Sequence, residues 1–213
     1  MNKEQIQKAL SELKQQPKKK FSQSYDLIIN LKQIDVKVNP VDAFVVLPHP
    51  KGKKAKIVAF VEPQFVELAQ KSCDLTIKDI DFPKYADKKL VKKLAEEYDY
   101  FIAQANLMPK VAATFGRVLG ARGKMPNPKT GCVVPPNVNW DALTKRLNSS
   151  VKLSAKKATN MQCTVGKEDQ SDQEIIDNIL NAYQAVLKQV PNEVQNIKSV
   201  LLKLTMSKPV RVI

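Results

Sequence analysis

The stretch that divides this 213-residue chain is "PHPKGKKAK", residues 48–56. It holds two prolines, one glycine and four lysines, a composition typical of a linker. The segment before it, "DAFVVLP" (42–48), predicts a strand, and "KIVAFV" (56–61) after it predicts another. Because the pattern of the chain changes on either side of this linker, we place a domain boundary here.

Beyond the linker, short apolar strands alternate with helices. The predicted strands are "KIVAFV" (56–61), "LTIKDI" (75–80) and "YFIAQ" (100–104). The predicted helices are "PQFVELAQKS" (63–72), "DKKLVKKLAEEY" (87–98), "LMPKVAATFGRVLG" (107–120) and "NWDALTKRLNSS" (139–150), the last with Asn139 as its N-cap. This alternation predicts a parallel sheet with helices on both faces.

The two ends of the chain follow a different pattern. Residues 3–15 predict a helix, "SYDLIINLK" (24–32) alternates with the period of a strand, and 151–166 predicts two strands. "SDQEIIDNILNAYQAVLKQV" (171–190) predicts a helix with a capping box of Ser171 and Glu174, and "IKSVLLKLTM" (197–206) predicts a final strand. Because chain termini usually lie close together, we predict one α+β domain from 1–50 and 150–213, with an α/β domain of 51–149 inserted into it.

The charge of the chain argues for a polyanionic partner. The net charge is +14 and the isoelectric point is about 9.6, while 43% of the residues are hydrophobic, enough to fill a core. The sequence contains no apolar run approaching the ~18 residues of a membrane span, and the N-terminus is charged from its third residue. We therefore expect a cytoplasmic protein without a membrane partner.

Residues suited to catalysis or metal binding are scarce. Cys73, Cys132 and Cys163 lack CxxC spacing and predict free thiols, and His49, the one histidine, sits in a proline-rich turn. We predict no catalytic residue, no metal ligand and no cofactor, and hence a protein that is not an enzyme.

"GRVLGARGKMPNPKTG" (116–131) carries four of the six glycines together with Arg122 and Lys124. It lacks the spacing of a P-loop, and its glycines follow a helix rather than a strand, which excludes a dinucleotide loop. Two interpretations stay open and are compatible: a helix that ends at Gly120 before a proline-stiffened loop, and a basic loop that contacts RNA through Arg122 and Lys124.

The chain ends carry the other candidate residues. "KKKFSQS" (18–24) places Lys18, Lys19 and Lys20 beside Phe21, cations for phosphates with an aromatic for a ribose or base. One face of the last strand offers hydroxyls and an ammonium from Ser199, Lys203 and Thr205. The competing interpretations are a solvated basic turn with Phe21 anchored in the core, and an ordinary half-exposed strand.

Six segments together resemble a known family. "KKKFSQSYDLIINLK", "VVLPHPKGKKAKI", "FIAQANLMP", "LGARGKMPNPKTG", "DNILNAYQAV" and "VLLKLTMSKPVRV" are similar, in order and over nearly the whole chain, to the ribosomal protein L-one family in its archaeal-type form. The resemblance implies a domain of both chain ends with an inserted Rossmann-like three-layer α/β domain. It also implies a cytoplasmic, ribosomal protein, monomeric when free, that binds the mobile rRNA stalk of the large subunit near the E site.

The resemblance further implies help in releasing deacylated tRNA from the E site and repression of translation of its own mRNA. Carried over by position, the rRNA-binding residues are Lys20, Phe21, Ser24, Asp26, Ser199, Thr205, Met206 and Ser207, to which Lys203 is added from the strand pattern. Ser207 stands where the family commonly has glycine, Ser24 where threonine is usual, and Ala121 where proline is usual. A glycine lets the backbone approach RNA closely, so we expect Ser207 to affect the affinity for RNA.

Two other functions remain to be separated from this one. The first is a nucleotide-using enzyme with its site at 116–131. The second is a nucleic-acid chaperone that binds by charge alone and does not prefer one RNA to another.

Overall fold

The computed structural model describes residues 1–17, 19–85, 87–135, 138–156 and 158–213. Lys18 of the basic run, and Lys157 between the two strands predicted over 151–166, lie outside the described residues. The chain forms two compact units. The first consists of Met1–Lys53 and Ser149–Ile213, and the second of Lys54–Asn148.

The first unit is built on an antiparallel sheet with the strand order β10-β9-β1-β8. Its strands are β1 (Ser24–Leu31), β8 (Asn160–Lys167), β9 (Ile197–Leu204) and β10 (Val210–Arg211). A separate antiparallel pair consists of β2 (Val41–Val46) and β7 (Ser150–Ala155). Every second residue of β1 is buried and the others are half-buried, so the sheet has one core face and one open face.

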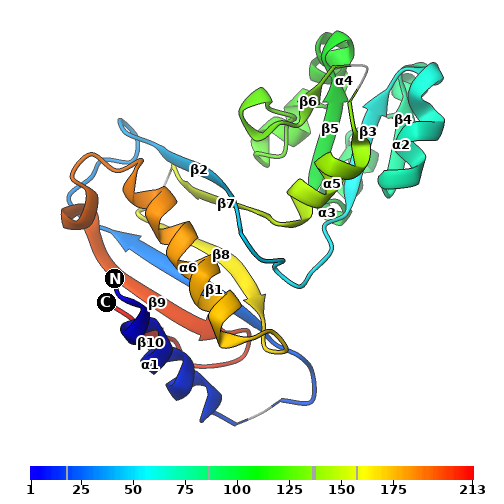
Figure 1. The fold of residues 1–213 in the computed structure, drawn as a ribbon. Helices are drawn as coiled ribbons and strands as arrows, with labels where there is room; N and C mark the ends of the chain where they lie inside the picture. Colours follow the sequence, from blue (N-terminus) through cyan, green and yellow to red (C-terminus); the bar gives the residue numbers. More distant parts are fainter. Residues whose placement is uncertain (18, 86, 136–137, 157) are drawn as a thin grey trace. The chain divides into compact units, whose positions relative to one another are not determined.

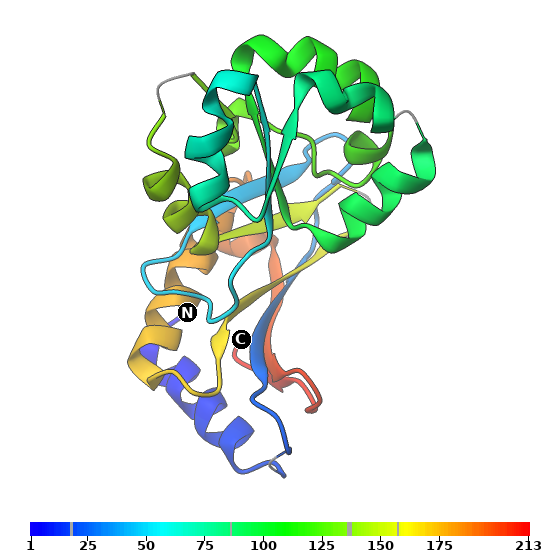
Figure 2. The ribbon, with the colours of Figure 1, turned by 90° about the vertical axis from the view of Figure 1, so that its right-hand side faces the viewer.

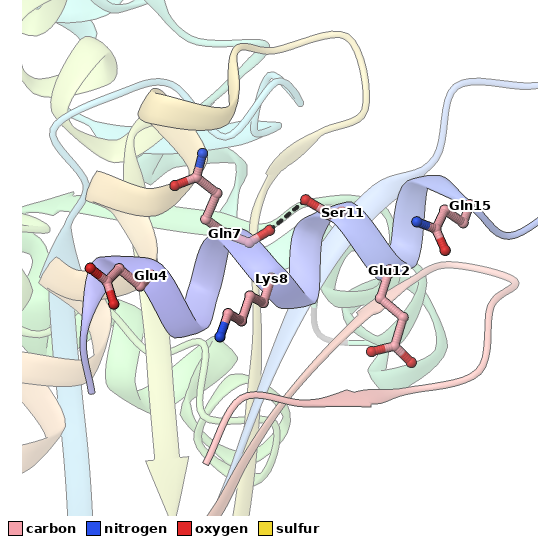
Figure 3. Close-up of a pocket in the computed structure, with 6 residues that line it drawn as sticks. All are labelled: Glu4, Gln7, Lys8, Ser11, Glu12 and Gln15. Atoms are coloured by element: carbon pink, nitrogen blue, oxygen red, sulfur yellow. Dashed lines mark hydrogen bonds between the residues drawn. The ribbon is translucent and has the colours of Figure 1, made fainter.

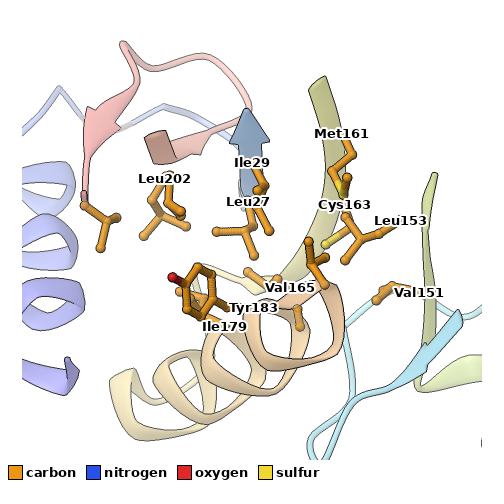
Figure 4. Close-up of a cluster of buried hydrophobic side chains, with 14 of the residues drawn as sticks. Leu27, Ile29, Val151, Leu153, Met161, Cys163, Val165, Ile179, Tyr183 and Leu202 are labelled. Carbon is orange, nitrogen blue, oxygen red and sulfur yellow. The ribbon is translucent and has the colours of Figure 1, made fainter. Parts of the chain in front are cut away.

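Two helices cover the core face of this sheet (Figures 1 and 4). Helix α1 (Lys3–Lys14) buries apolar residues at helical spacing, among them Ile6, Leu10 and Leu13. Helix α6 (Asp172–Leu187) begins with the predicted capping box, in which the Ser171 hydroxyl and the Glu174 carboxylate each accept from the other residue's backbone N–H. Ile179 and Tyr183 of α6 pack beneath the strands, as Figure 4 shows.

The outward face of α1 is polar and exposed. Figure 3 shows its side chains, and the Ser11 hydroxyl donates a hydrogen bond of 2.9 Å to the carbonyl of Gln7, one turn earlier. The amphipathic pattern of this short helix therefore directs its apolar stripe to the sheet and leaves a mixed polar face in water.

The second unit is a parallel sheet with the order β4-β3-β5-β6. Its strands are β3 (Ile57–Val61), β4 (Leu75–Lys78), β5 (Tyr100–Gln104) and β6 (Val133–Val134), and its helices are α2 (Val66–Ser72), α3 (Lys88–Glu97), α4 (Met108–Ala121) and α5 (Trp140–Asn148). Helix α3 packs beside α4 and α2 beside α5, with the sheet between the two pairs (Figure 2). Short 3-10 segments add Pro63–Phe65, Asp79–Tyr85, Ala105–Leu107 and Pro128–Thr130 here, and Glu193–Asn196 in the first unit.

Aromatic side chains fill the layer between this sheet and the helices α3 and α4. The ring of Phe60 on β3 lies 4.7 Å from that of Phe115 on α4 and 5.7 Å from that of Phe82, between ring centroids. Strand β3 is buried along its whole length, as expected for a central strand covered on both faces. The predicted fold class, an α+β domain of both chain ends with an inserted three-layer α/β domain, is confirmed.

The sequence pattern missed two strands. Strands β6 and β10 are each two residues long, too short to show an alternation of polar and apolar residues. In the part of the chain that the structure describes, no helix combines the length and apolar character needed to cross a bilayer.

We expect Gly166→Ala to destabilise the first unit by about 2 kcal/mol, the usual cost of overpacking. A Cβ at this position of β8 would overlap Cδ1 of the buried Ile175 and lie 2.5 Å from Oε1 of Gln170. This Oε1 accepts from the Lys167 N–H, and Nε2 of the same side chain donates to the Pro50 carbonyl. Urea unfolding followed by circular dichroism measures the change. The matched control is Gly120→Ala, where no atom lies within 4 Å of the new Cβ. Equal stability of the two variants would contradict the prediction.

Candidate nucleic-acid interface

The open face of the first unit's sheet carries three cross-strand rows centred on β1. Asp26 lies between Thr164 of β8 and Lys203 of β9, and the Thr164 hydroxyl donates to the Asp26 carboxylate at 2.8 Å. At the other end of the strand, the Asn30 amide donates to the Ser199 hydroxyl at 2.9 Å. Between these polar rows Ile28 lies opposite Leu201. The strand register therefore brings predicted residues from both chain ends onto one half-exposed surface.

The turn that follows β9 is tied to the start of β1. The Ser24 backbone N–H donates to the Thr205 hydroxyl at 3.1 Å, and the Met206 N–H donates to the side-chain carbonyl of Gln23 at 3.0 Å. Because β9 ends at Leu204, Met206 does not continue the apolar face of the strand, and its side chain is 65% exposed. These bonds hold the predicted residues of 20–26 and 199–207 next to each other.

Gln23 was not among the predicted residues, although it organises this contact. Its side chain is only 2% exposed, and its main chain pairs with Glu168, which donates its N–H to the Gln23 carbonyl at 2.9 Å. Gln23 directly precedes the predicted strand 24–32 and is two and four residues before the buried Tyr25 and Leu27. A polar residue that continues the alternation of the buried side was therefore the available signal. A buried polar side chain must find partners, and here they are the backbone of the facing turn.

Ser207 fits the turn without glycine-like geometry. Among the described non-glycine residues a positive φ occurs only at Gln33 and Glu193. The Ser207 hydroxyl accepts from the Leu204 N–H at 2.7 Å and lies 3.2 Å from the Leu204 carbonyl. The serine thus caps the end of β9 with its own side chain. Its effect on the affinity for RNA stays a prediction to be measured.

Phe21 lies on the surface and not in the core. Its side chain is 51% exposed, and Lys20 beside it is exposed as well. The alternative that Phe21 anchors a solvated turn in the core is therefore wrong. An exposed aromatic ring next to a cation is suited to stacking on a base or ribose of an RNA loop.

The core beneath this face stays uncharged. Burial raises the pKa of the Tyr25 hydroxyl to about 12, with smaller contributions from the carboxylates of Asp172 and Glu168. Burial also raises the pKa of the Cys163 thiol to about 12, with a further contribution from Asp26. Near neutral pH both groups are protonated, so the charges of this face come from Asp26 and the lysines around it.

The glycine-rich loop of the second unit has a structural explanation. Helix α4 runs on through Gly120, so the prediction that it ends there is wrong; the left-handed residue is Gly123, with φ of 65°. The Lys124 N–H donates to the Leu119 carbonyl and the Gly123 N–H to the Gly120 carbonyl, which is the Schellman arrangement. A helix tolerates a glycine in its interior as well as at its end, so spacing alone placed the C-cap at Gly120, two residues before Arg122.

The two predicted cations of this loop contact helix α3. The Arg122 guanidinium pairs with Glu96 at 2.6 Å. The Lys124 ammonium donates to the backbone carbonyls of Ala95 and Tyr98 at 2.9 and 2.7 Å, at the end of α3. Both side chains therefore link the end of α4 to α3 within the second unit. Their contact with RNA stays a prediction.

The strand order of the second unit defines where a nucleotide would bind in a fold of this kind. With β4 on one side of β3 and β5 on the other, the switch point lies between the carboxyl ends of β3 and β5. Gln104, which is 1% exposed at the end of β5, spans this point and accepts from the Glu62 N–H at 2.8 Å. The chain's own side chain thus occupies the position between the two strand ends.

A discontinuous α+β domain interrupted by an α/β domain of this strand order defines a class of two-domain proteins. The family model described as "Ribosomal protein L1p/L10e family" matches residues 13–208. The chain belongs to this family, and the predicted resemblance is confirmed. Because the family consists of structural ribosomal proteins, the prediction that this chain is not an enzyme is confirmed as well.

Curated relatives extend over nearly the whole chain. "Large ribosomal subunit protein uL1" of Nanoarchaeum equitans is 42% identical over 200 residues, covering 92% of this chain and 93% of that protein. The protein of the same name from Methanothermococcus thermolithotrophicus is 37% identical over 216 residues, covering 100% and 99%. That of Thermofilum pendens is 38% identical over 200 residues, covering 92% and 86%.

We expect Lys124→Met to lower the free energy of unfolding of the second unit by about 2 kcal/mol, because two carbonyls lose a charged donor. Denaturant unfolding followed by the fluorescence of Trp140, which lies in this unit, measures the loss. Lys129→Met is the control, because its side chain is exposed in the same loop. A Lys124→Met protein as stable as the control would show that the ammonium contributes nothing to α3.

Proposed function

We propose that this structural constituent of the large ribosomal subunit binds the mobile rRNA stalk near the E site through the open sheet face of its first unit. The observation that carries the proposal is the pair of hydrogen bonds from Ser24 and Met206 to Thr205 and Gln23. They join the segments around Phe21 and Thr205, which are far apart in sequence, into one surface. Both segments hold the residues that the family resemblance assigns to rRNA.

The chemistry of this surface suits a folded RNA. Hydroxyl and amide groups of Ser24, Ser199 and Asn30 can bond ribose 2′-OH groups, while Lys20 and Lys203 can bind phosphates. Asp26 is an acceptor only, held by Thr164, and can bond a ribose hydroxyl or a base amino group. A surface of this kind recognises the shape and backbone of RNA instead of stacking a row of bases.

Further activities follow from the same position on the ribosome. Bound to a mobile stalk near the E site, the protein assists the release of deacylated tRNA. When free, it is a cytoplasmic monomer whose stalk-binding surface also binds a similar fold in its own mRNA and represses translation. Because one surface serves both RNAs, stalk rRNA and the mRNA compete for the protein.

The competing proposal is a basic protein that binds any RNA by charge. Competition between labelled stalk rRNA and scrambled RNA of equal length, at low and high salt, separates the two. Binding by charge alone loses affinity for both RNAs together, with a slope of about 0.7 to 0.9 per phosphate contact. A preference for the stalk that survives high salt supports the proposal, and its absence contradicts it.

We expect Phe21→Ala and Thr205→Ala each to weaken stalk binding by about tenfold or more, through lost stacking and through release of the turn. Thr205→Ser keeps the acceptor for the Ser24 N–H and should restore binding. Lys129→Ala, in the second unit, should change the dissociation constant less than about threefold. Fluorescence anisotropy with a labelled stalk fragment measures all four. A larger loss for Lys129→Ala than for Thr205→Ala would move the site to the other unit.

A further inference from the structure

Helix α3 of the second unit presents a row of lysines to solvent. Lys88, Lys89, Lys92 and Lys93 are all exposed, and their spacing places them on one side of the helix. The opposite side is buried against the core, through Val91, Leu94 and Ala95. We call the four lysines the α3 lysine face.

The charges of this helix are arranged against its own stability. The N-terminus of a helix favours negative side chains and the C-terminus positive ones. Asp87 caps α3 by accepting from the Lys89 N–H, but the four lysines follow in the first half of the helix, and Glu96 and Glu97 lie in its last turn. Lys88 and Lys92, and Lys89 and Lys93, are also like charges at i and i+4, which repel. Within the helix, the stabilising charges are the Asp87 cap and the opposite charges of Lys92 and Lys93 with Glu96 and Glu97 at i and i+4.

Side chains from other elements of the unit pair with the acidic end of α3. Arg122 pairs with Glu96 at 2.6 Å, Lys56 with Glu97 at 3.2 Å, and Lys124 donates to the carbonyls of Ala95 and Tyr98. The hydrogen bond from Arg122 holds the pKa of the Glu96 carboxyl below its usual range. Among the described residues, no carboxylate lies within ion-pair distance of the four ammonium groups of the α3 lysine face.

We propose that the α3 lysine face binds the phosphate backbone of folded RNA, as a second RNA-binding surface separate from the open sheet face. An RNA backbone supplies negative charges to these four ammonium groups, none of which has an ion pair among the described residues. Arg122 and Lys124 are then positioning residues, because their bonds to the end of α3 set the direction in which the lysines project. This inference rests on the proposed function in one respect, which is that the partner of the protein is RNA.

The expected signature is a change in salt dependence. Each phosphate contact contributes about 0.7 to 0.9 to the slope of log affinity against log salt, so loss of four contacts lowers the slope by about 3. A general loss of positive charge weakens binding without removing contacts. The two effects are separated by comparing variants of equal net charge.

The test variant replaces all four lysines of the face, as Lys88→Gln, Lys89→Gln, Lys92→Gln and Lys93→Gln. The control variant replaces four exposed lysines elsewhere in the same unit, as Lys71→Gln, Lys78→Gln, Lys129→Gln and Lys145→Gln. Both lower the net charge of +14 by four. Glutamine keeps the helix propensity of lysine, and circular dichroism verifies that both variants fold.

Each full-length protein is first saturated with unlabelled stalk rRNA fragment and then titrated with a labelled RNA over a range of salt concentrations. One arm uses deacylated tRNA, and the other uses an rRNA hairpin from outside the stalk. We expect the test variant to bind at least one of these about tenfold more weakly than the control, with the lower slope. The arm that shows this loss identifies the source of the RNA.

Equal binding by the test and control variants in both arms overturns the proposal, and so does a failure of both RNAs to bind the unsubstituted, saturated protein. The stalk fragment is compared with scrambled RNA in a separate titration of the unsubstituted chain. If the unsubstituted chain does not prefer the stalk fragment to scrambled RNA, the proposed function alone is contradicted. The test and control variants are also compared without the stalk fragment, so the result for the α3 lysine face does not depend on that preference.

Discussion

The antiparallel pairing of β1 with β9 is the constraint on which the rest of the structure depends. It joins residues near the start of the chain to residues near its end, with Tyr25 opposite Leu204 and Ile29 opposite Val200 on the core face. Each bond in this ladder closes the chain around the whole inserted unit, so the apolar contacts beneath the sheet must offset a large loop-closure entropy. The same register places Asp26 opposite Lys203 on the open face.

The register of β1 with β9 therefore determines both the core and the open face of the first unit. A one-residue slip of β9 would bury Lys203 and expose Leu202, so the buried side chains specify which polar groups face an RNA. Gln23 extends this coupling past the end of the ladder, because a buried amide requires a partner and finds it in the turn at Met206. The candidate interface is thereby positioned by the hydrophobic core and not by flexible loops.

The second unit shows how a fold and a function separate. Its strand order is one that often binds nucleotides, yet Gln104 spans the switch point and the loop 116–131 lacks a phosphate-binding spacing. The cations of that loop, Arg122 and Lys124, are bound to α3. The α3 lysine face is exposed on the same unit, and the partner proposed for it is RNA and not a cofactor.

The sequence by itself determined the long elements and the class of fold, because the apolar periods of two residues in a strand and 3.6 in a helix lie within a single segment. Strands β1 and β9 and helix α6 follow these periods, and the capping box at Ser171 is also local. It also carried the family resemblance and the excess of positive charge. Only the tertiary structure decided the strand order, the two-residue strands β6 and β10, the end of α4 at Ala121 before the left-handed Gly123, and the partners of Arg122, Lys124, Thr205 and Gln23. These depend on side chains from segments far apart along the chain, and no local pattern records which distant group a hydroxyl, an amide or an ammonium will meet.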